Sequence, residues 1–131
     1  MKQQTIKGEA VPSLGLGTYR LTGEECMRTV ECALALGYRH IDTAQMYGNE
    51  AKVGRGIQNS RVAREKVFLV TKVWPSDFSH DRVIGTTHES LRKLRTDYID
   101  LLLMHWPSQS VPLDETLGAL GNCRRRGASG T

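Results

Sequence analysis

Four side chains that together can do proton chemistry follow the apolar segments of this chain: Asp42, Tyr47, Lys72 and His105. A phenol such as that of Tyr47 is a poor acid at neutral pH, since an ordinary tyrosine has a pKa of roughly 10. An adjacent ammonium, here Lys72, favours the phenolate and makes proton donation easier. Asp42 would hold that ammonium charged, and His105 would orient a substrate carbonyl through its ring N–H.

Such a set prepares a carbonyl oxygen to accept a proton while its carbon accepts a hydride. The hydride must come from a cofactor, because no side chain donates one. Each residue alone also has an ordinary structural interpretation: a helix cap, a half-buried aromatic ring, a snorkelling lysine or a core histidine. Their succession at the ends of predicted strands favours one shared site. A rival use of Lys72, as an amine that forms a Schiff base, explains neither Tyr47 nor the turn Gly17-Thr18-Tyr19.

Apolar runs of strand length alternate with segments of helical period. The runs VFLVTKV and YIDLLLMHW are nearly continuous, as in strands that are covered on both faces. Thr22 and Glu25 form a capping-box pattern that predicts the start of a helix, and Gly37 predicts its end. The predicted strands span residues 14–17, 39–43, 67–73 and 98–105, and the later helices span residues 49–58 and 80–94.

The repeats of strand then helix, about thirty residues each, favour an α/β fold with parallel strands and helical crossovers. A doubly wound sheet and a (β/α)8 barrel are both built this way, and the periodicity does not choose between them. Both folds place their chemistry at the carboxyl ends of the strands. At those ends the sequence has Gly17 and Thr18, then Asp42, Lys72 and His105.

Length and composition indicate one small domain with an ordinary core, because the chain has 131 residues of which 39% are hydrophobic. No apolar run approaches the roughly 18–20 residues of a membrane span, and the N-terminal residues hold no apolar signal core. We therefore expect a soluble, cytoplasmic protein with no membrane partner. Cys26, Cys32 and Cys123 have no metal-ligand spacing, so we expect reduced thiols and no metal site.

The formal net charge of +4 raises the question of a nucleic-acid partner. Three of these charges belong to Arg124, Arg125 and Arg126, and elsewhere basic residues alternate with acidic ones, as on a solvated helix face. We therefore expect no nucleic-acid partner. A contact through the three arginines stays an alternative that salt-dependent binding of a tail deletion would test.

Residues 11–120 resemble the N-terminal half of the aldo-keto reductase family through GLGTYRL, GYRHIDTAQMYGNEAKVG, VFLVTKVW and LRKLRTDYIDLLLMHWP. Within the family they are most similar to the bacterial 2,5-diketo-D-gluconate reductase B subgroup. The resemblance implies a (β/α)8 TIM barrel, of which about the first four β/α units are present. It also implies an oxidoreductase that uses NADPH to reduce small aldehydes and ketones, such as 2,5-diketo-gluconate or methylglyoxal-like carbonyls.

The resemblance also implies roles for individual residues. Tyr47 would be the general acid, Lys72 the partner that lowers its pKa, Asp42 the residue paired with that lysine, and His105 the group that orients the carbonyl. The cofactor-binding residues would be Gly17, Thr18 and Asp42. The substrate pocket would be formed by Tyr19, Trp74, His105 and Trp106.

We expect residues 1–120 to be the N-terminal half of such a barrel and residues 121–131 to be an out-of-frame tail. The tail, GNCRRRGASGT, breaks the amphipathic pattern that VPLDETLGAL begins, and a shifted reading frame can restore a helix ending and the entry to a fifth strand. Resequencing the gene tests this hypothesis.

We expect the 131-residue chain alone to be inactive and prone to self-association, whereas full-length relatives would be monomeric. The alternative is a non-catalytic fragment or interaction protein of the same fold.

Overall fold

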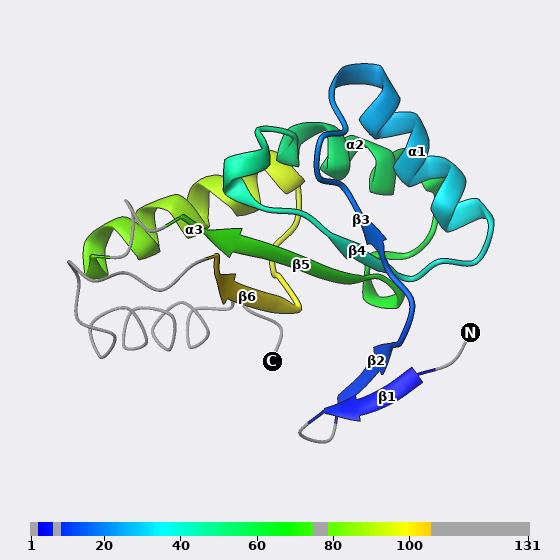
Figure 1. Cartoon of the computed structure of the whole chain (residues 1–131), viewed down its shortest axis with the longest axis horizontal. Coiled ribbons are helices and arrows are strands. Elements are labelled where there is room, and N and C mark those ends of the chain that lie inside the picture. The colour runs from blue at the N-terminus through cyan, green and yellow to red at the C-terminus, as the bar shows by residue number, and fades with distance from the viewer. Residues whose placement is uncertain (1–2, 7–8, 75–78, 106–131) are drawn as a thin grey trace.

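The computed structural model describes residues 3–6, 9–74 and 79–105 (Figure 1). An antiparallel hairpin comes first, and strands then alternate with helices. The elements are β1 (Gln3–Ile6), β2 (Glu9–Pro12), β3 (Leu16–Gly17), α1 (Gly23–Ala35), β4 (His40–Asp42), the 3-10 helix η1 (Gln45–Tyr47), α2 (Glu50–Ser60), the 3-10 helix η2 (Arg64–Lys66), β5 (Phe68–Val73), α3 (His80–Leu94) and β6 (Leu101–Met104).

The central sheet has four parallel strands in the order β3-β4-β5-β6. The helices α1, α2 and α3 connect them, and they lie along one side of the sheet in Figure 1. The core between sheet and helices buries residues from both layers: Cys26, Val30, Leu34, Ile41, Val53, Ile57, Val67, Leu69, Leu94 and Ile99. The predicted parallel α/β fold is therefore confirmed, with shorter strands β4 and β6 than the sequence predicted.

Gly37 terminates helix α1, as the sequence predicted, and lies directly after the C-cap residue Leu36. The N–H of Gly37 donates to the Leu34 carbonyl at 3.2 Å, and the N–H of Tyr38 donates to the Ala33 carbonyl at 3.0 Å. This pair of bonds is the Schellman arrangement, which requires the left-handed φ of +104° that Gly37 adopts.

The predicted capping box at the start of α1 is wrong. Thr22 does occupy the N-cap position in an extended conformation, but its side chain makes no capping hydrogen bond. Gly23 follows with a φ of +53°, so the chain enters the helix through a left-handed residue. In a capping box, by contrast, the hydroxyl of the N-cap residue accepts a hydrogen bond from the backbone N–H three residues later.

Two glycines let α2 pack closely against its neighbours. A Cβ atom on Gly54 would lie 2.7 Å from the backbone of Leu94 in α3, and one on Gly56 would lie 2.8 Å from the Met27 carbonyl oxygen in α1. No side chain fits at these distances. The short contacts hold together the helix layer that supports the carboxyl ends of the strands.

At the other end of the strands, Arg64 ties the beginnings of β5 and β6 together. Its guanidinium donates to the carbonyls of Val67 and Tyr98, each at 2.8 Å, and forms an ion pair with Asp100 at 3.0 Å. Asp100 in turn accepts from the Leu69 N–H at 2.8 Å. This network fixes the register of the two strands whose far ends carry Lys72 and His105.

The hairpin β1-β2 was not predicted from the sequence. Its strands pair antiparallel from Gln3 with Pro12 to Ile6 with Glu9. A nitrogen of the His40 ring, Nδ1, lies 3.1 Å from the Pro12 carbonyl oxygen, at the amino end of β4. The hairpin therefore lies at the end of the sheet opposite to the predicted site residues.

Candidate active site

The carboxyl ends of the four parallel strands bring the predicted site residues to one edge of the sheet. Gly17 ends β3 and pairs with Asp42 at the end of β4. Lys72 is the penultimate residue of β5, and His105 directly follows β6. The His105 N–H continues the ladder by donating to the Val73 carbonyl at 2.9 Å. The register of the parallel strands therefore brings these residues together, as the sequence predicted.

Lys72 is the centre of this group. Its ammonium forms an ion pair with the Asp42 carboxylate and donates to the Thr43 carbonyl at 3.0 Å. The phenol oxygen of Tyr47 lies 3.5 Å from the same nitrogen. The Lys72 side chain is only 14% exposed, so its charge acts on its neighbours with little screening by water.

Tyr47 lies on η1, the turn after β4, and faces the other aromatic residues of the rim. Its ring meets the His105 ring edge-on, with the centroids 5.7 Å apart, and the Tyr19 ring at 5.2 Å. Trp74 also contacts His105, with ring centroids 5.1 Å apart. Two predicted pocket residues, Tyr19 and His105, therefore contact the predicted proton donor, and a third, Trp74, contacts His105.

A pocket of about 530 Å³ opens between these rings. It is lined by Tyr19, Arg20, Met46, Tyr47, Trp74 and His105. The sequence did not single out Arg20 or Met46, and their only signal was their position next to Tyr19 and Tyr47. Arg20 adopts a left-handed φ of +66° and its guanidinium lies 5.2 Å from the centroid of the Tyr19 ring. Trp106 lies outside the described residues.

The surroundings of His105 lower the pKa of its imidazole. Burial is the largest cause, because it disfavours the charged form, and the positive charge of Lys72 adds to it, while Asp42 acts in the opposite direction. The ring is therefore neutral at physiological pH. A neutral imidazole still has one N–H that can donate to a carbonyl oxygen.

Gly17, Thr18 and Asp42, the predicted cofactor-binding residues, form a corner at the ends of β3 and β4. Thr18 is fully buried, and both its N–H and its hydroxyl donate to the Asp42 carbonyl, at 3.0 and 3.1 Å. Gly17 is exposed with open space where a side chain would be, and the Asp42 carboxylate is 41% exposed. The polar group available to a ligand here is therefore that carboxylate, and the Thr18 hydroxyl serves the turn.

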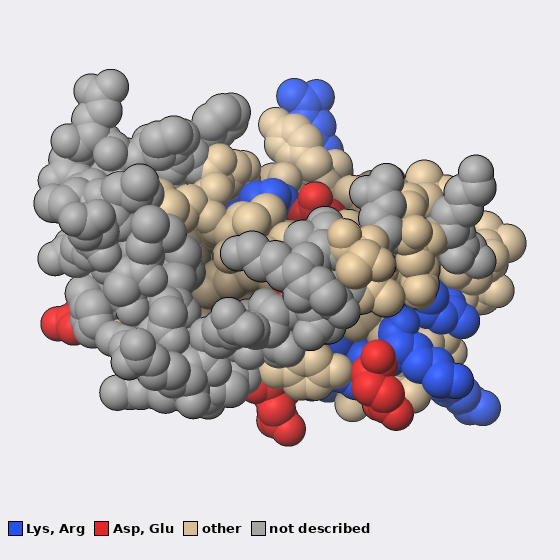
Figure 2. Space-filling view, turned by 90° about the horizontal axis from the view of Figure 1, so that it is seen from below, with Lys and Arg blue, Asp and Glu red and all other residues tan. Residues whose placement is uncertain are grey.

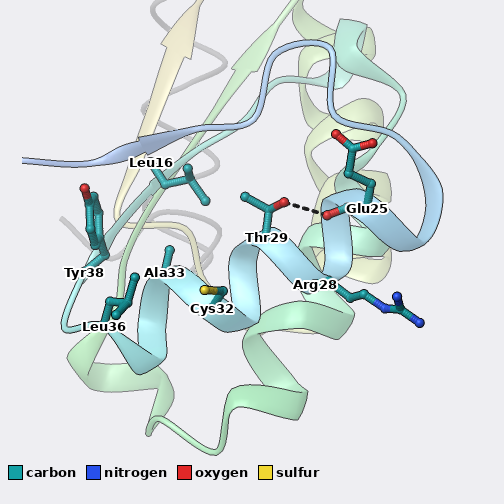
Figure 3. A pocket seen from close by; sticks show the side chains of 8 residues that line it. All are labelled: Leu16, Glu25, Arg28, Thr29, Cys32, Ala33, Leu36 and Tyr38. Atoms are coloured by element: carbon teal, nitrogen blue, oxygen red, sulfur yellow. Dashed lines mark hydrogen bonds between the residues drawn. The ribbon is translucent and has the colours of Figure 1, made fainter.

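A slightly larger hollow, of about 570 Å³, lies elsewhere (Figure 3). It runs along α1 and holds none of the predicted site residues; its lining is Leu16, Glu25, Arg28, Thr29, Cys32, Ala33, Leu36 and Tyr38. In Figure 3 the Thr29 hydroxyl donates within the helix, to the Glu25 carbonyl at 2.7 Å. Since the predicted site residues Tyr47 and His105 line the aromatic pocket, we place the chemistry there.

On the face drawn in Figure 2, acidic and basic side chains both occur among the described residues. Within residues 3–6, 9–74 and 79–105, no group of three His, Cys, Asp or Glu side chains is placed to hold a metal ion. Over the same residues, no helix combines the length and apolar character needed to cross a membrane.

The four-stranded parallel sheet with its polar site at the carboxyl ends of the strands is of the α/β class, and comparison with known sequences identifies the family. The profile of the aldo/keto reductase family matches residues 13–129. The chain belongs to the aldo-keto reductase family, and its described elements are the first half of that family's (β/α)8 TIM barrel.

Curated bacterial relatives agree with the predicted subgroup. The chain is 48% identical over 120 residues to the methylglyoxal reductase DkgB of Escherichia coli O157:H7, and 46% identical over 119 residues to that of Salmonella typhi. These matches cover 90% and 89% of this chain but 45% of each relative. The chain thus spans about half the length of the curated relatives it matches.

Solved structures match in the same way. A structure provisionally named as a 2,5-diketo-D-gluconic acid reductase B is 53% identical, with a TM-score of 0.90, and the match covers 93% of this chain and 43% of that one. The Bombyx mori aldo-keto reductase in complex with NADP is 34% identical, with a TM-score of 0.88, and the match covers 98% and 48%.

Proposed function

We propose that this chain supplies the proton-donating half of an NADPH-dependent reductase of small aldehydes and ketones, with Tyr47 as the proton donor. One observation carries the proposal. The Lys72 ammonium lies between the Asp42 carboxylate and the Tyr47 phenol oxygen, where it can stabilise the phenolate that proton donation leaves behind. The family membership supports carbonyl reduction as the reaction class.

In this mechanism the carbonyl oxygen of the substrate lies between Tyr47 and His105. The neutral His105 ring donates a hydrogen bond to that oxygen, and Tyr47 transfers its phenolic proton to it. The positive charge of Lys72, which forms an ion pair with Asp42, stabilises the resulting phenolate. Solvent then returns a proton to Tyr47. One hydride on the carbonyl carbon and one proton on the oxygen convert the carbonyl to an alcohol.

NADPH, when bound, supplies that hydride. On this chain the exposed Gly17 and the partly exposed Asp42 carboxylate fit the role of bordering it, because a carboxylate accepts hydrogen bonds from ribose hydroxyls. The complex of the Bombyx mori relative with NADP supports the choice of cofactor.

The proposed substrates are small carbonyl compounds of the methylglyoxal or 2,5-diketo-gluconate kind. Two of the curated bacterial relatives carry the name methylglyoxal reductase. The aromatic faces of Tyr19 and Trp74 in the pocket suit the apolar part of such a molecule, and Tyr47 and His105 suit its oxygen.

The test is a chimaera in which residues 1–120 replace the matching residues of the E. coli O157:H7 relative. We expect the purified chimaera to show saturable oxidation of NADPH with methylglyoxal. A folded chimaera that binds NADPH but reduces no carbonyl would contradict the proposal. We expect the 131-residue chain alone to show no such oxidation, and saturable turnover by that chain would contradict the division of the site between two halves.

A second candidate function, as an interaction protein of the same fold, has one observation in its favour. Leu101 and Leu103 of β6 are 36% and 38% exposed, and among the described residues β6 pairs only with β5. An exposed apolar strand at a sheet edge is a surface on which a further chain can pair. Sedimentation of the 131-residue chain would distinguish a monomer from a self-associating species.

A further inference from the structure

The turn that carries Tyr47 has few bonds of its own. η1 is a single 3-10 turn, in which the Tyr47 N–H donates to the Ala44 carbonyl at 3.1 Å and the Gly48 N–H donates to the Gln45 carbonyl at 3.3 Å. Short 3-10 segments have poor hydrogen-bond geometry, so other groups must fix such a turn in place. The side-chain amides two residues before and two residues after Tyr47 meet this need.

Gln45 attaches the turn to helix α3. Its Nε2 donates to the Ser90 hydroxyl oxygen at 3.0 Å and to the Thr86 carbonyl at 3.2 Å. The Ser90 hydroxyl donates in turn to the buried carboxylate of Glu50. Thr71, the residue before Lys72, donates to the same carboxylate at 2.7 Å. One side of the turn is therefore linked, through three hydrogen bonds, to the strand that carries Lys72.

Asn49 attaches the other side of the turn to the loop after β3. Its side chain is 2% exposed, and its Nδ2 donates to the carbonyls of Thr18 at 2.8 Å and Leu21 at 3.0 Å. Its Oδ1 accepts from the Thr43 hydroxyl at 2.7 Å. The carbonyl of Thr43 is the one that binds the Lys72 ammonium, so Asn49 also links the turn to the lysine.

We propose that Gln45 and Asn49 are positioning residues that hold Tyr47 at the Lys72 ammonium. Neither side chain is assigned contact with the substrate or the cofactor. Gln45 and Asn49 fix the turn that carries Tyr47 from its two sides, and both are linked by hydrogen bonds to the segments around Lys72. The inference rests on the proposed role of Tyr47 for its catalytic consequence, but the placement itself can be measured without any activity.

The test uses Gln45→Met and Asn49→Asp in the chimaera of residues 1–120 with the E. coli O157:H7 relative. Methionine keeps the length of glutamine and removes its N–H donors. Aspartate keeps the shape of asparagine, but its carboxylate would face and repel the carbonyl oxygens of Thr18 and Leu21. The matched controls are Gln58→Met and Asn59→Asp, which make the same changes at exposed positions of α2.

The first readout is the nuclear Overhauser cross peak between the Tyr47 ring and the Lys72 side chain, identified by its absence in Lys72→Met. The wild-type distance from Lys72 Nζ to the ring centroid is 5.2 Å, so a cross peak from the adjoining methylene is expected. We expect it to be lost or weakened several-fold in both variants and unchanged in both controls. If Asn49→Asp prevents folding, Gln45→Met alone tests the proposal, because Gln45 is only half-buried and its replacement should leave the protein folded. A cross peak of full intensity in folded Gln45→Met would overturn the proposal.

The second readout separates placement from function. In the chimaera, both variants should lower kcat by roughly 10- to 100-fold with little change in KM, the size of effect that a misplaced catalytic group produces. A lost cross peak with unchanged kcat would leave the positioning inference intact and contradict the proposed role of Tyr47. A reduced kcat with an intact cross peak would overturn the positioning inference.

Discussion

The Lys72 ammonium lies 3.5 Å from the Tyr47 phenol oxygen, although the two residues are 25 positions apart in the sequence. The strand β5 brings the lysine to the edge of the sheet, and the turn η1 brings the tyrosine back over it. The Asp42 carboxylate, on the neighbouring strand, forms an ion pair with the lysine. The predictions below test this arrangement and the fold that produces it.

His105 gives the protein a measurable pH dependence. Its pKa is lowered in the folded state, chiefly by burial, whereas an unfolded histidine titrates near pH 6.5. The unfolded chain therefore binds a proton more readily, and stability is lost as the pH falls through about 6.5 toward the lower folded pKa. His105→Gln should flatten the fall in the unfolding midpoint between about pH 7.5 and 5.5. The exposed His88→Gln in α3 is the control, and an equal effect there would contradict the prediction.

Glu50 should make stability depend on pH in the opposite direction. Burial raises the pKa of its carboxyl group, against the bonds from Thr71 and Ser90 that lower it. The folded protein thus holds this proton to a higher pH than an unfolded glutamate, which titrates near pH 4.3. Stability is therefore lost as the pH rises from about 4.3 through the folded pKa. We expect Glu50→Gln to reduce this loss in urea unfolding, and the exposed Glu65→Gln to leave it unchanged.

The glycines of α2 give a test of packing. Gly54→Ala and Gly56→Ala should each lower the free energy of unfolding by about 1–3 kcal/mol, because the added methyl group would lie within 2.8 Å of a neighbouring helix. Gly85→Ala in α3 meets nothing within 4 Å, and should raise stability by roughly 0.5–1 kcal/mol. Equal effects at all three positions in urea unfolding would show that the helix layer is not packed as described.

The open face of β6 predicts self-association of the 131-residue chain. Replacing Leu101 and Leu103 by lysine should shift its sedimentation profile toward the monomer, because lysine on an edge strand opposes pairing. Leu36→Lys is the control, since Leu36 is 74% exposed and lies at the end of α1, away from strand β6 in the sequence. A sharp monomeric unfolding transition of the unmodified chain that does not depend on concentration would contradict this prediction.

The sequence predicted the elements whose signals are local. Helix α3 was placed within its observed bounds by its apolar period, and the Schellman end of α1 was indicated by Gly37. The order of the polar residues at the strand ends followed from parallel pairing alone. The choice of a barrel over a doubly wound sheet needed the family resemblance, because both give the same local pattern.

Other features depend on tertiary contacts and left no local signal. The hairpin β1-β2 is stabilised through pairing and through Pro12 at His40, neither of which a periodicity reveals. The burial of Asn49 and its bonds to two separate segments, the loop after β3 and Thr43 after β4, depend on how β3, β4 and α2 meet. Trp106 and the division of the chain at residue 120 lie outside what the structure describes, so both stay predictions.

The most direct test of the account is the effect of Tyr47→Phe on the chimaera with the E. coli O157:H7 relative. This change removes the phenol oxygen and keeps the ring contacts with His105 and Tyr19. We predict that kcat for methylglyoxal falls by about 10²- to 10⁴-fold, the usual contribution of a general acid, while NADPH binding measured by fluorescence is unchanged. A variant that binds NADPH and retains wild-type kcat would contradict the assignment of Tyr47 as the proton donor.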